Sequence, residues 1–230
     1  MEPASPPPPT LPLVRQHLPG LDESHLEKLA QLAALVRDWN ARVNLVSRKD
    51  VDHLEEHHLL HSLLVTRVLQ PAAGASLVDL GTGGGFPGLP LAIVFPQCRF
   101  TLVDSVAKKG RAVADMAAAL GLANVRVIIE RAEKVRDRFD FVLGRAVAAL
   151  PEFLGWALPR LRSGAAGAPG NGVLYFKGTL WREELADAGP QSQPASVWDL
   201  HEFAPTPYFE GKFLLHFPAP AGIAGGRRVG

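Results

Sequence analysis

Short apolar runs alternate with helix-length segments between residues 76 and 177, and this alternation restricts the fold more than any other feature of the sequence. The runs that we expect to form strands are 76–80, 99–103, 125–129, 139–143 and 173–176. The segments that we expect to form helices are 87–95, 107–120, 150–161 and 181–188. Parallel strands need such crossover helices. The pattern therefore predicts an α/β fold with a mostly parallel sheet and helices on both faces, closed by an antiparallel pair, 197–203 and 212–217.

A glycine-rich loop, Asp79-Leu80-Gly81-Thr82-Gly83-Gly84-Gly85-Phe86-Pro87-Gly88, follows the first predicted strand and opens a helix. Gly81, Gly83 and Gly85 permit a tight turn and let a ligand approach the backbone closely. A phosphate-binding P-loop ends in Gly-Lys-Ser/Thr, which is absent here, and a dinucleotide loop has glycine where this chain has Phe86. The remaining pattern, an acid followed by alternating glycines beginning at Asp79, favours S-adenosylmethionine, which carries no phosphate.

Acidic residues also follow the next two predicted strands. Asp104, with Ser105 after it, ends the second strand, where a carboxylate can accept hydrogen bonds from ribose hydroxyls. Ala132 and Glu133 follow the third strand and are placed to lie beside an adenine ring. Each acid taken alone is equally well explained as a strand-end or helix-capping residue. Their joint placement predicts a cofactor site at the carboxyl edge of the sheet.

The composition excludes several classes of protein. Lysine and arginine number 24 against 23 acids, so the formal charge of +1 excludes a polybasic tail, although a local basic face remains compatible with nucleic acid. Cys98 is the single cysteine, which excludes a disulfide framework and a cysteine-based zinc site. We see no apolar run of membrane-spanning length and no secretory signal at the N-terminus. We therefore expect a soluble, cytoplasmic protein.

Four histidines lie close together at His53, His57, His58 and His61. On one helix, His57 and His61 have the spacing of a metal-binding pair. No glutamate lies between these two in the HExxH pattern, and no third ligand is evident. We interpret the histidines as core or RNA-facing residues and predict no metal.

Several motifs together resemble one known family, the ribosomal small subunit methyltransferase G family, also called glucose-inhibited division protein B. The motifs that carry the resemblance are Trp39-Asn40, Asn44-Leu45, His58 to Leu63, Asp79 to Pro90, Leu102 to Ser105, Lys108-Lys109, Arg131 to Glu133, Arg145 to Val147 and Lys177-Gly178. The resemblance implies a class I, Rossmann-like S-adenosylmethionine-dependent methyltransferase that methylates guanine N7 in small-subunit (16S) ribosomal RNA, free or in the assembled subunit. It implies that Gly81, Phe86, Asp104, Ala132, Glu133 and Arg145 line the cofactor site. The chain departs from the family at His61, often aspartate, at Ala112, often aromatic, and in its closing strand, which lacks the usual basic ending.

The chain divides into four predicted regions. Residues 1–20, rich in proline, are predicted to be a mobile tail, and 21–70 an N-terminal helical extension with helices at 22–39 and 50–69. Residues 71–218 are predicted to form the methyltransferase domain, and 219–230 a C-terminal tail. We expect a monomer.

The residues are compatible with guanine N7 as the methyl acceptor. N7 has a free in-plane lone pair, so its methylation needs no general base. Methylation of pyrimidine C5 needs a nucleophilic cysteine, but Cys98 at a strand start is typical of packing, and Pro205-Thr206-Pro207-Tyr208 is not the motif of exocyclic-amine methylation. Arg145 and Lys177, which follow the fourth and fifth strands, are the candidate catalytic residues. Arg145 is placed to contact the cofactor carboxylate or the guanine, or to pair with Asp140 or Glu133.

Basic residues are concentrated between residues 99 and 145, where ten lysines and arginines face six acids. We expect this segment to contribute to a phosphate-contacting face. The candidate RNA-binding residues are Lys108, Lys109, Arg111 and His61.

Three other functions remain open at this point. A methyltransferase that acts on a small molecule or a protein has the same cofactor motifs. A non-catalytic domain that keeps the fold as a binding module is disfavoured by the intact glycines and acids. A nicotinamide oxidoreductase is disfavoured by Phe86.

Overall fold

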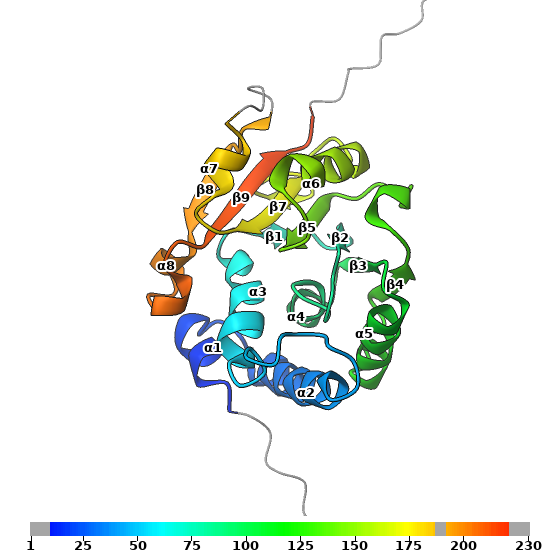
Figure 1. Ribbon diagram of the computed structural model, residues 1–230, viewed down its shortest axis with the longest axis vertical. Helices are drawn as coiled ribbons and strands as arrows, with labels where there is room; N and C mark the ends of the chain where they lie inside the picture. Colours follow the sequence, from blue (N-terminus) through cyan, green and yellow to red (C-terminus); the bar gives the residue numbers. More distant parts are fainter. Residues whose placement is uncertain (1–9, 187–191, 221–230) are drawn as a thin grey trace, which may run out of the picture.

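The centre of the computed structural model, which describes residues 10–186 and 192–220, is a seven-stranded sheet in the order β4-β3-β2-β5-β7-β9-β8 (Figure 1). The strands are β2 (Ser76–Leu80), β3 (Arg99–Asp104), β4 (Val125–Ile129), β5 (Phe141–Arg145), β7 (Gly172–Lys177), β8 (Ser196–Asp199) and β9 (Phe213–Pro218). β2, β3, β4, β5 and β7 pair in parallel, and β9 runs antiparallel to both β7 and β8. The mostly parallel α/β sheet predicted from the sequence is confirmed.

The buried side chains divide into two clusters, one on each face of this sheet. In β2, Leu77 belongs to the first cluster and Val78 to the second, because successive side chains of a strand point to opposite faces. The first face is covered by α2 (Glu23–Asn40), α4 (Gly88–Val94) and α5 (Ala107–Ala119), and the second by α6 (Leu150–Ala157), the 3₁₀ turn η4 (Leu158–Arg160) and α7 (Trp181–Glu184). The helices thus lie on both faces, as expected.

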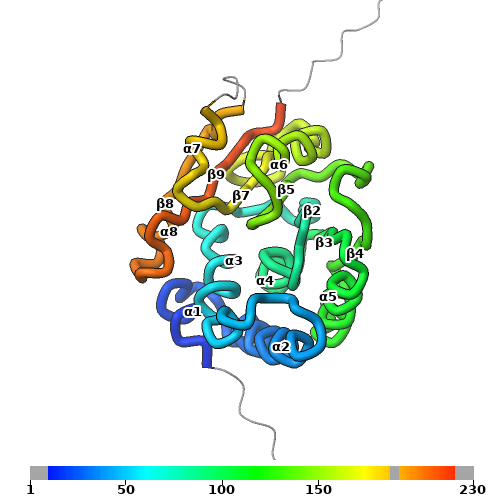
Figure 2. The backbone as a smooth tube through the Cα atoms, viewed as in Figure 1, coloured from blue at the N-terminus to red at the C-terminus, as the bar shows by residue number. Residues whose placement is uncertain are grey.

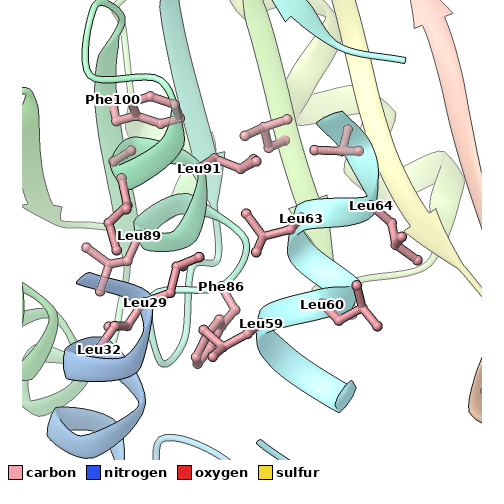
Figure 3. Close-up of a cluster of buried hydrophobic side chains, with 14 of the residues drawn as sticks. Leu29, Leu32, Leu59, Leu60, Leu63, Leu64, Phe86, Leu89, Leu91 and Phe100 are labelled. Atoms are coloured by element: carbon pink, nitrogen blue, oxygen red, sulfur yellow. The ribbon is translucent and has the colours of Figure 1, made fainter. Parts of the chain in front are cut away.

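The N-terminal helices share the first cluster with the sheet. Leu29 and Leu32 of α2, Leu59 and Leu63 from the next helical segment, and Leu89 of α4 converge in one apolar layer (Figure 3). In Figure 2 the blue and cyan N-terminal segments surround α4 on two sides, in agreement with contacts from α2 and α3 (His61–Leu63) to α4. The N-terminal part therefore extends one layer of the α/β domain.

Residues 12–17 form a helix, α1 (Pro12–His17), where the sequence predicted a mobile tail. Pro12 stands in the first turn, where its missing N–H costs nothing. The backbone N–H groups of Leu13 and Val14 donate to Glu55 Oε1, at 2.6 and 3.0 Å, and Val14 is fully buried. The tail prediction is wrong for residues 10–20, and the prolines at positions 3 and 6–9 lie outside the described residues.

The helix predicted over 50–69 is interrupted. It consists of a π-helical segment, η1 (Glu55–Leu60), the short α3, and a 3₁₀ turn, η2 (Leu64–Arg67). At the first junction the His61 N–H donates to both Glu56 O and His58 O. Apolar spacing in the sequence marks a helical segment but does not distinguish these helix types, and π-helical segments are frequent at functional sites.

Smaller differences occur toward the C-terminus. The strand predicted over 197–203 ends at Asp199, whose side chain accepts from the His201 N–H at 2.9 Å and starts α8 (Leu200–Phe203). The 3₁₀ turn η6 (Pro207–Phe209) precedes β9. The glycine-rich stretch 163–172 contains β6 (Gly167–Ala168), which pairs with β1 (Gln70–Pro71).

Residues 187–188 of the predicted helix over 181–188, and 221–230 of the predicted C-terminal tail, lie outside the described residues. Where the chain is described, it has no helix long and apolar enough to cross a membrane.

Candidate active site

A cavity of about 570 Å³ opens at the carboxyl ends of β2, β3, β4 and β5. Its size is typical of a small-molecule site. Open α/β sheets bind ligands at this edge. The predicted site residues that line it are Gly81, Gly83, Phe86, Asp104, Ser105, Lys109, Ala132, Glu133 and Arg145. The structure thus brings together most of the residues that the sequence singled out for the cofactor.

Asp79 supports the glycine loop from behind. Its side chain is fully buried, and its Oδ2 accepts from the Thr82 hydroxyl at 2.7 Å and from the Gly88 N–H at 2.9 Å. Burial raises the pKa of Asp79 to about 6. Asp79 and Gly85 are outside the set of described residues that line the cavity, so Asp79 shapes the loop and does not face a ligand there.

The loop itself is open toward the cavity. Gly81, Gly83 and Gly85 have positive φ angles of 71°, 58° and 92°, which disfavour any residue with a side chain. A Cβ at Gly81 would approach Val147 Cγ1 to 2.6 Å, whereas a Cβ at Gly83 would meet only Gly81 O, at 4.0 Å. The backbone at Gly83 therefore borders space that a ligand can fill.

Asp104 connects the glycine loop to the end of β3. Its Oδ2 accepts from the Gly83 N–H at 2.9 Å, and its Oδ1 accepts from the Val106 N–H at 2.8 Å. Asp104 is 8% exposed and lines the cavity. Each carboxylate oxygen retains a lone pair for a hydroxyl group. The carboxylate is thus fixed in place before a ligand arrives.

Arg145 is held from the opposite side of the cavity by the π-helical segment. Its Nη1 donates to His57 O at 3.0 Å and its Nη2 donates to His58 Nδ1 at 2.9 Å. The guanidinium carbon lies 5.6 Å from the centre of the Phe86 ring. Burial lowers the pKa of Arg145, but a guanidinium stays charged at neutral pH. The structural alternative, a pairing of Arg145 with Asp140 or Glu133, is not formed, because Asp140 accepts from Ser76 and Asn171 and Glu133 lies near Arg131.

His58 is the neutral partner of this arginine. Burial, followed by the charge of Arg145, lowers the pKa of His58 to about 3. Because the arginine only donates, Nδ1 of His58 is the acceptor and the ring proton is on Nε2. That atom is buried and has no hydrogen-bond partner among the described residues.

Lys177 does not reach the cavity. Its ammonium group donates to both carboxylate oxygens of Glu184, at 2.5 and 2.7 Å, and Glu184 Oε2 also accepts from the Leu150 N–H at 2.6 Å. The pair fastens the end of β7 to α7 and the start of α6. The structure therefore gives Lys177 a place in packing, which differs from the predicted catalytic position.

The four predicted RNA-binding residues lie in different environments. His61 is 7% exposed, its Nδ1 lies 3.0 Å from the Tyr208 hydroxyl, and its ring packs edge-on against Phe176 and Phe209. This burial corrects the expectation that His61 faces RNA. Lys109 lines the cavity, and Lys108 and Arg111 are exposed on α5.

Sequence reasoning missed several lining residues. Leu45 and Val46 enter the cavity from the turn after α2, where both backbone N–H groups donate to Asn40 Oδ1, at 2.8 and 2.9 Å. Asn40 and Leu45 belong to the motifs Trp39-Asn40 and Asn44-Leu45 of the family resemblance, so these motifs could have indicated this part of the lining. Glu152 and Trp156 of α6 also line the cavity and carry no local sequence signal.

The histidine cluster forms a stack. His57 packs on Tyr208 with ring centres 3.8 Å apart and on His53 at 4.9 Å, and its Nδ1 lies 2.8 Å from Asp50 Oδ1. Within residues 10–186 and 192–220, no three histidines, cysteines or acids are arranged to hold a metal ion.

The residues of the cavity fit S-adenosylmethionine. The open backbone at Gly83 suits the amino-acid end of the molecule, and the fixed Asp104 carboxylate suits the two ribose hydroxyls. Ala132 and Glu133, on the turn η3 (Ala132–Lys134), stand beside Asp104 at the same end, next to the expected adenine position.

Solved structures with the same fold include a methyltransferase. The fibrillarin/Nop5p complex superimposes with a TM-score of 0.52 at 11% identity, over 70% of this chain and 80% of that one. Geranyl diphosphate C-methyltransferase from Streptomyces coelicolor, solved with S-adenosyl-L-homocysteine, gives 0.51 at 12% identity, over 81% and 96%. At these identities the likeness establishes the fold alone.

The sequence comparisons identify the family. Ribosomal RNA small subunit methyltransferase G of Flavobacterium psychrophilum is 40% identical over 89% of this chain and 96% of its own length. The protein of the same name from Porphyromonas gingivalis is 40% identical over 90% and 92%. The family model described as GidB, rRNA small subunit methyltransferase G, matches residues 25–200. The chain therefore belongs to the rRNA small subunit methyltransferase G family and is an S-adenosylmethionine-dependent methyltransferase.

Proposed function

We propose that the protein transfers a methyl group from S-adenosylmethionine to N7 of a guanine in small-subunit (16S) ribosomal RNA. The relatives' name supports the RNA substrate. The observation that carries the proposal is the single cavity in which the glycine loop and Asp104 stand opposite the clamped Arg145. One side of this cavity suits a methyl donor, and the other offers hydrogen-bond donors to a second reactant.

The residues that would hold the donor come from three neighbouring strand ends. The loop at Gly81 and Gly83 would bind its amino-acid end, Asp104 its ribose hydroxyls, and Ala132 and Glu133 its adenine. When bound, S-adenosylmethionine supplies an electrophilic methyl group on a sulfonium centre.

The protein's own contribution is orientation. Guanine N7 attacks with a free lone pair, so no side chain needs to remove a proton. His58, with a pKa of about 3, stays neutral at physiological pH and is a weak base there. Arg145 has three N–H groups beyond the two given to His57 and His58, and guanine O6 is an acceptor adjacent to N7 on the same edge. Arg145 would thus hold the base by O6 and leave N7 free.

Holding two reactants in line can lower a barrier by roughly 7–11 kcal/mol in favourable cases. This is the effect that the proposal requires from the cavity. Lys177 and His61 would take no part in it, because Lys177 is paired with Glu184 and His61 packs against aromatic rings.

Labelled S-adenosylmethionine tests the proposal when it is incubated with the protein and, in parallel, small ribosomal subunits, naked 16S RNA, or a mixture of metabolites. We expect label in RNA, at a guanine that borohydride and aniline treatment cleaves. Label in a protein or a metabolite would support the other class of methyltransferase. Donor binding without transfer to any acceptor would make the protein a binding module. Comparison of subunits with naked RNA decides whether assembly is needed.

The cofactor site has its own test in Asp104→Ala. Loss of one hydrogen bond to the donor should weaken its binding by at least about 1 kcal/mol, roughly fivefold in Kd by calorimetry. Asp115→Ala is the matched control, since Asp115 is exposed on α5 outside the cavity. Equal Kd values for the two variants would remove Asp104 from the site. The monomeric state and the cytoplasmic location stay predictions.

A further inference from the structure

A second cavity, of about 420 Å³, lies at the opposite edge of the sheet. It is formed where β2, β3 and β4 begin and where the chain approaches β5. Its most distinctive lining residues are four arginines, Arg99, Arg126, Arg138 and Arg162. We call it the arginine cavity.

The charges of the arginine cavity are only partly balanced. Arg126 pairs with Asp137 in the cavity wall, and Arg162 donates to Ser76 Oγ at 2.7 Å with Asp140 Oδ2 at 3.6 Å. Across the described part of the chain, neither Arg99 nor Arg138 has a carboxylate within 4.0 Å. Both are exposed. Arg138 Nη1 donates to Leu161 O at 3.4 Å, which leaves its charge unbalanced. The cavity thus holds two guanidinium groups that have no ion pair with another described residue, and this favours an anionic ligand.

Guanidinium groups bind phosphate oxygens through paired N–H donors, and clustered arginines are typical of phosphate recognition. Methyl transfer at the other edge makes no use of these residues. The sequence predicted a phosphate-contacting face over residues 99–145, and the structure divides that segment. Lys109, Arg131 and Arg145 line the first cavity, whereas Arg99, Arg126 and Arg138 line the second.

We propose that the arginine cavity binds backbone phosphates of the RNA substrate, as a second contact remote from the methylated guanine. The inference rests on the proposed function in so far as the acceptor is RNA. Ser76, the first residue of β2, lines the arginine cavity, and Gly81, directly after the strand, lines the active site five residues further along the chain. At a rise of about 3.3 Å per residue this separates the two by roughly 17 Å. A long structured RNA spans that distance, whereas a substrate of one or two nucleotides does not.

The salt dependence of RNA binding tests this contact. The double variant Arg99→Ala/Arg138→Ala is compared with Lys28→Ala/Arg37→Ala, which removes the same charge from exposed positions on α2 outside both cavities. Each phosphate contact contributes about 0.7–0.9 to the slope of log Kd against log salt concentration. With a labelled 16S RNA fragment, we expect the arginine variant to reduce the slope by about 1 to 2 and the control to leave it unchanged. Both variants should keep the wild-type Kd for S-adenosylmethionine, which shows that the fold is intact.

An unchanged slope in the arginine variant would overturn the inference, as would an equal reduction in the control. Free phosphate compounds are the alternative ligands of the arginine cavity. Calorimetry with inorganic tripolyphosphate distinguishes them from RNA phosphates. If the arginine variant loses tripolyphosphate binding but keeps the RNA slope, the cavity holds free phosphate compounds and the RNA contact is wrong. Methyl transfer to the same RNA by the wild-type protein is measured in parallel. A reduced slope without any transfer would retain the contact and reject the proposed reaction, and transfer with an unchanged slope would do the reverse.

Discussion

The charged side chains at the two edges of the sheet differ in how firmly hydrogen bonds and ion pairs hold them. At the carboxyl edge, Asp104 and Arg145 are held by backbone and side-chain partners, and His58 is kept neutral beside them. At the amino edge, Arg126 and Arg162 have partners, but Arg99 and Arg138 are exposed and have no ion pair with another described residue. A small ligand of fixed shape requires groups that are already oriented, because ordering them on binding costs affinity. A flexible polyanion can adapt to exposed cations that no ion pair holds in place. The contrast indicates that substitutions at the carboxyl edge change stability and affinity, while those at the amino edge change the dependence on salt.

The largest effect is expected from acid, which lowers the stability of the fold through His58 at the carboxyl edge. The pKa of His58 is about 3 in the folded protein, below its ordinary value of 6.5, so unfolding takes up a proton between these values. The stability from this group is therefore complete above pH 6.5 and is lost as the pH falls toward 3. At pH 4 the loss of stability from this group amounts to on the order of 3 kcal/mol. His58→Asn keeps an acceptor for Arg145 and should lose less stability than the wild type between pH 7 and pH 4, by urea unfolding.

Asp79 acts in the opposite direction, because its raised pKa of about 6 makes the folded state bind its proton more tightly. The difference between wild type and His58→Asn cancels this contribution. His53→Asn, at an exposed histidine, should follow the wild type. Parallel pH profiles for wild type and His58→Asn would contradict the neutral, buried state of His58.

Removal of Arg145 tests whether the clamped guanidinium contacts the reactants. Hydrogen bonds to charged groups contribute about 1.5–3 kcal/mol, so Arg145→Ala should reduce the rate of methyl transfer to RNA by about 10- to 150-fold. Arg145→Lys keeps the charge but cannot reach both His57 O and His58 Nδ1 as the fork does, and should recover only part of the rate. Full activity in Arg145→Ala would leave the arginine with a purely structural role.

Gly81→Ala tests how strongly the backbone of the glycine loop is constrained at the carboxyl edge. A left-handed φ of 71° costs a residue with a side chain about 1–2 kcal/mol, and the new Cβ would lie 2.6 Å from Val147 Cγ1. We expect a lower free energy of unfolding and weaker donor binding. Gly155→Ala, on α6 with open space around its Cβ, should be neutral or slightly stabilising. If the two variants were equally stable, the loop would have more freedom than its geometry indicates.

The smallest effect is expected at the amino edge. Asp137→Asn releases Arg126 from its ion pair. Exposed pairs contribute up to about 1 kcal/mol, so RNA binding should strengthen by about two- to threefold and become more dependent on salt. Donor affinity should not change. Weaker RNA binding in this variant would count against the arginine cavity as a phosphate site.

Local signals predicted the parts of the site that depend on neighbours in the sequence. The glycine loop and the acid at the end of β3 were found because strand order places successive carboxyl ends at one edge. The partners of Arg145 were not found, because they lie 87 and 88 residues away. Glu55, which holds the start of α1, is about 40 residues from that helix. Long-range hydrogen bonds of this kind produce no periodic pattern in the amino-acid sequence.

Two residues predicted to be functional, Lys177 and His61, instead make structural contacts away from the cavity. Lys177 ends its strand as Arg145 does, but Glu184 stands close enough to pair with it. His61 lies on the helical turn after His58, yet it points into the aromatic layer under Tyr208. Sequence spacing gave the right edge of the sheet in the first case and the right helical segment in the second, but side-chain direction depends on packing.

A crystal structure with S-adenosylmethionine added is the most direct trial of where the methyl donor sits. The sugar hydroxyls should lie within hydrogen-bonding distance of the Asp104 carboxylate, with the base next to Ala132. Density for the donor in any other location, or an aromatic side chain of Phe86 filling the space instead, would refute the assignment.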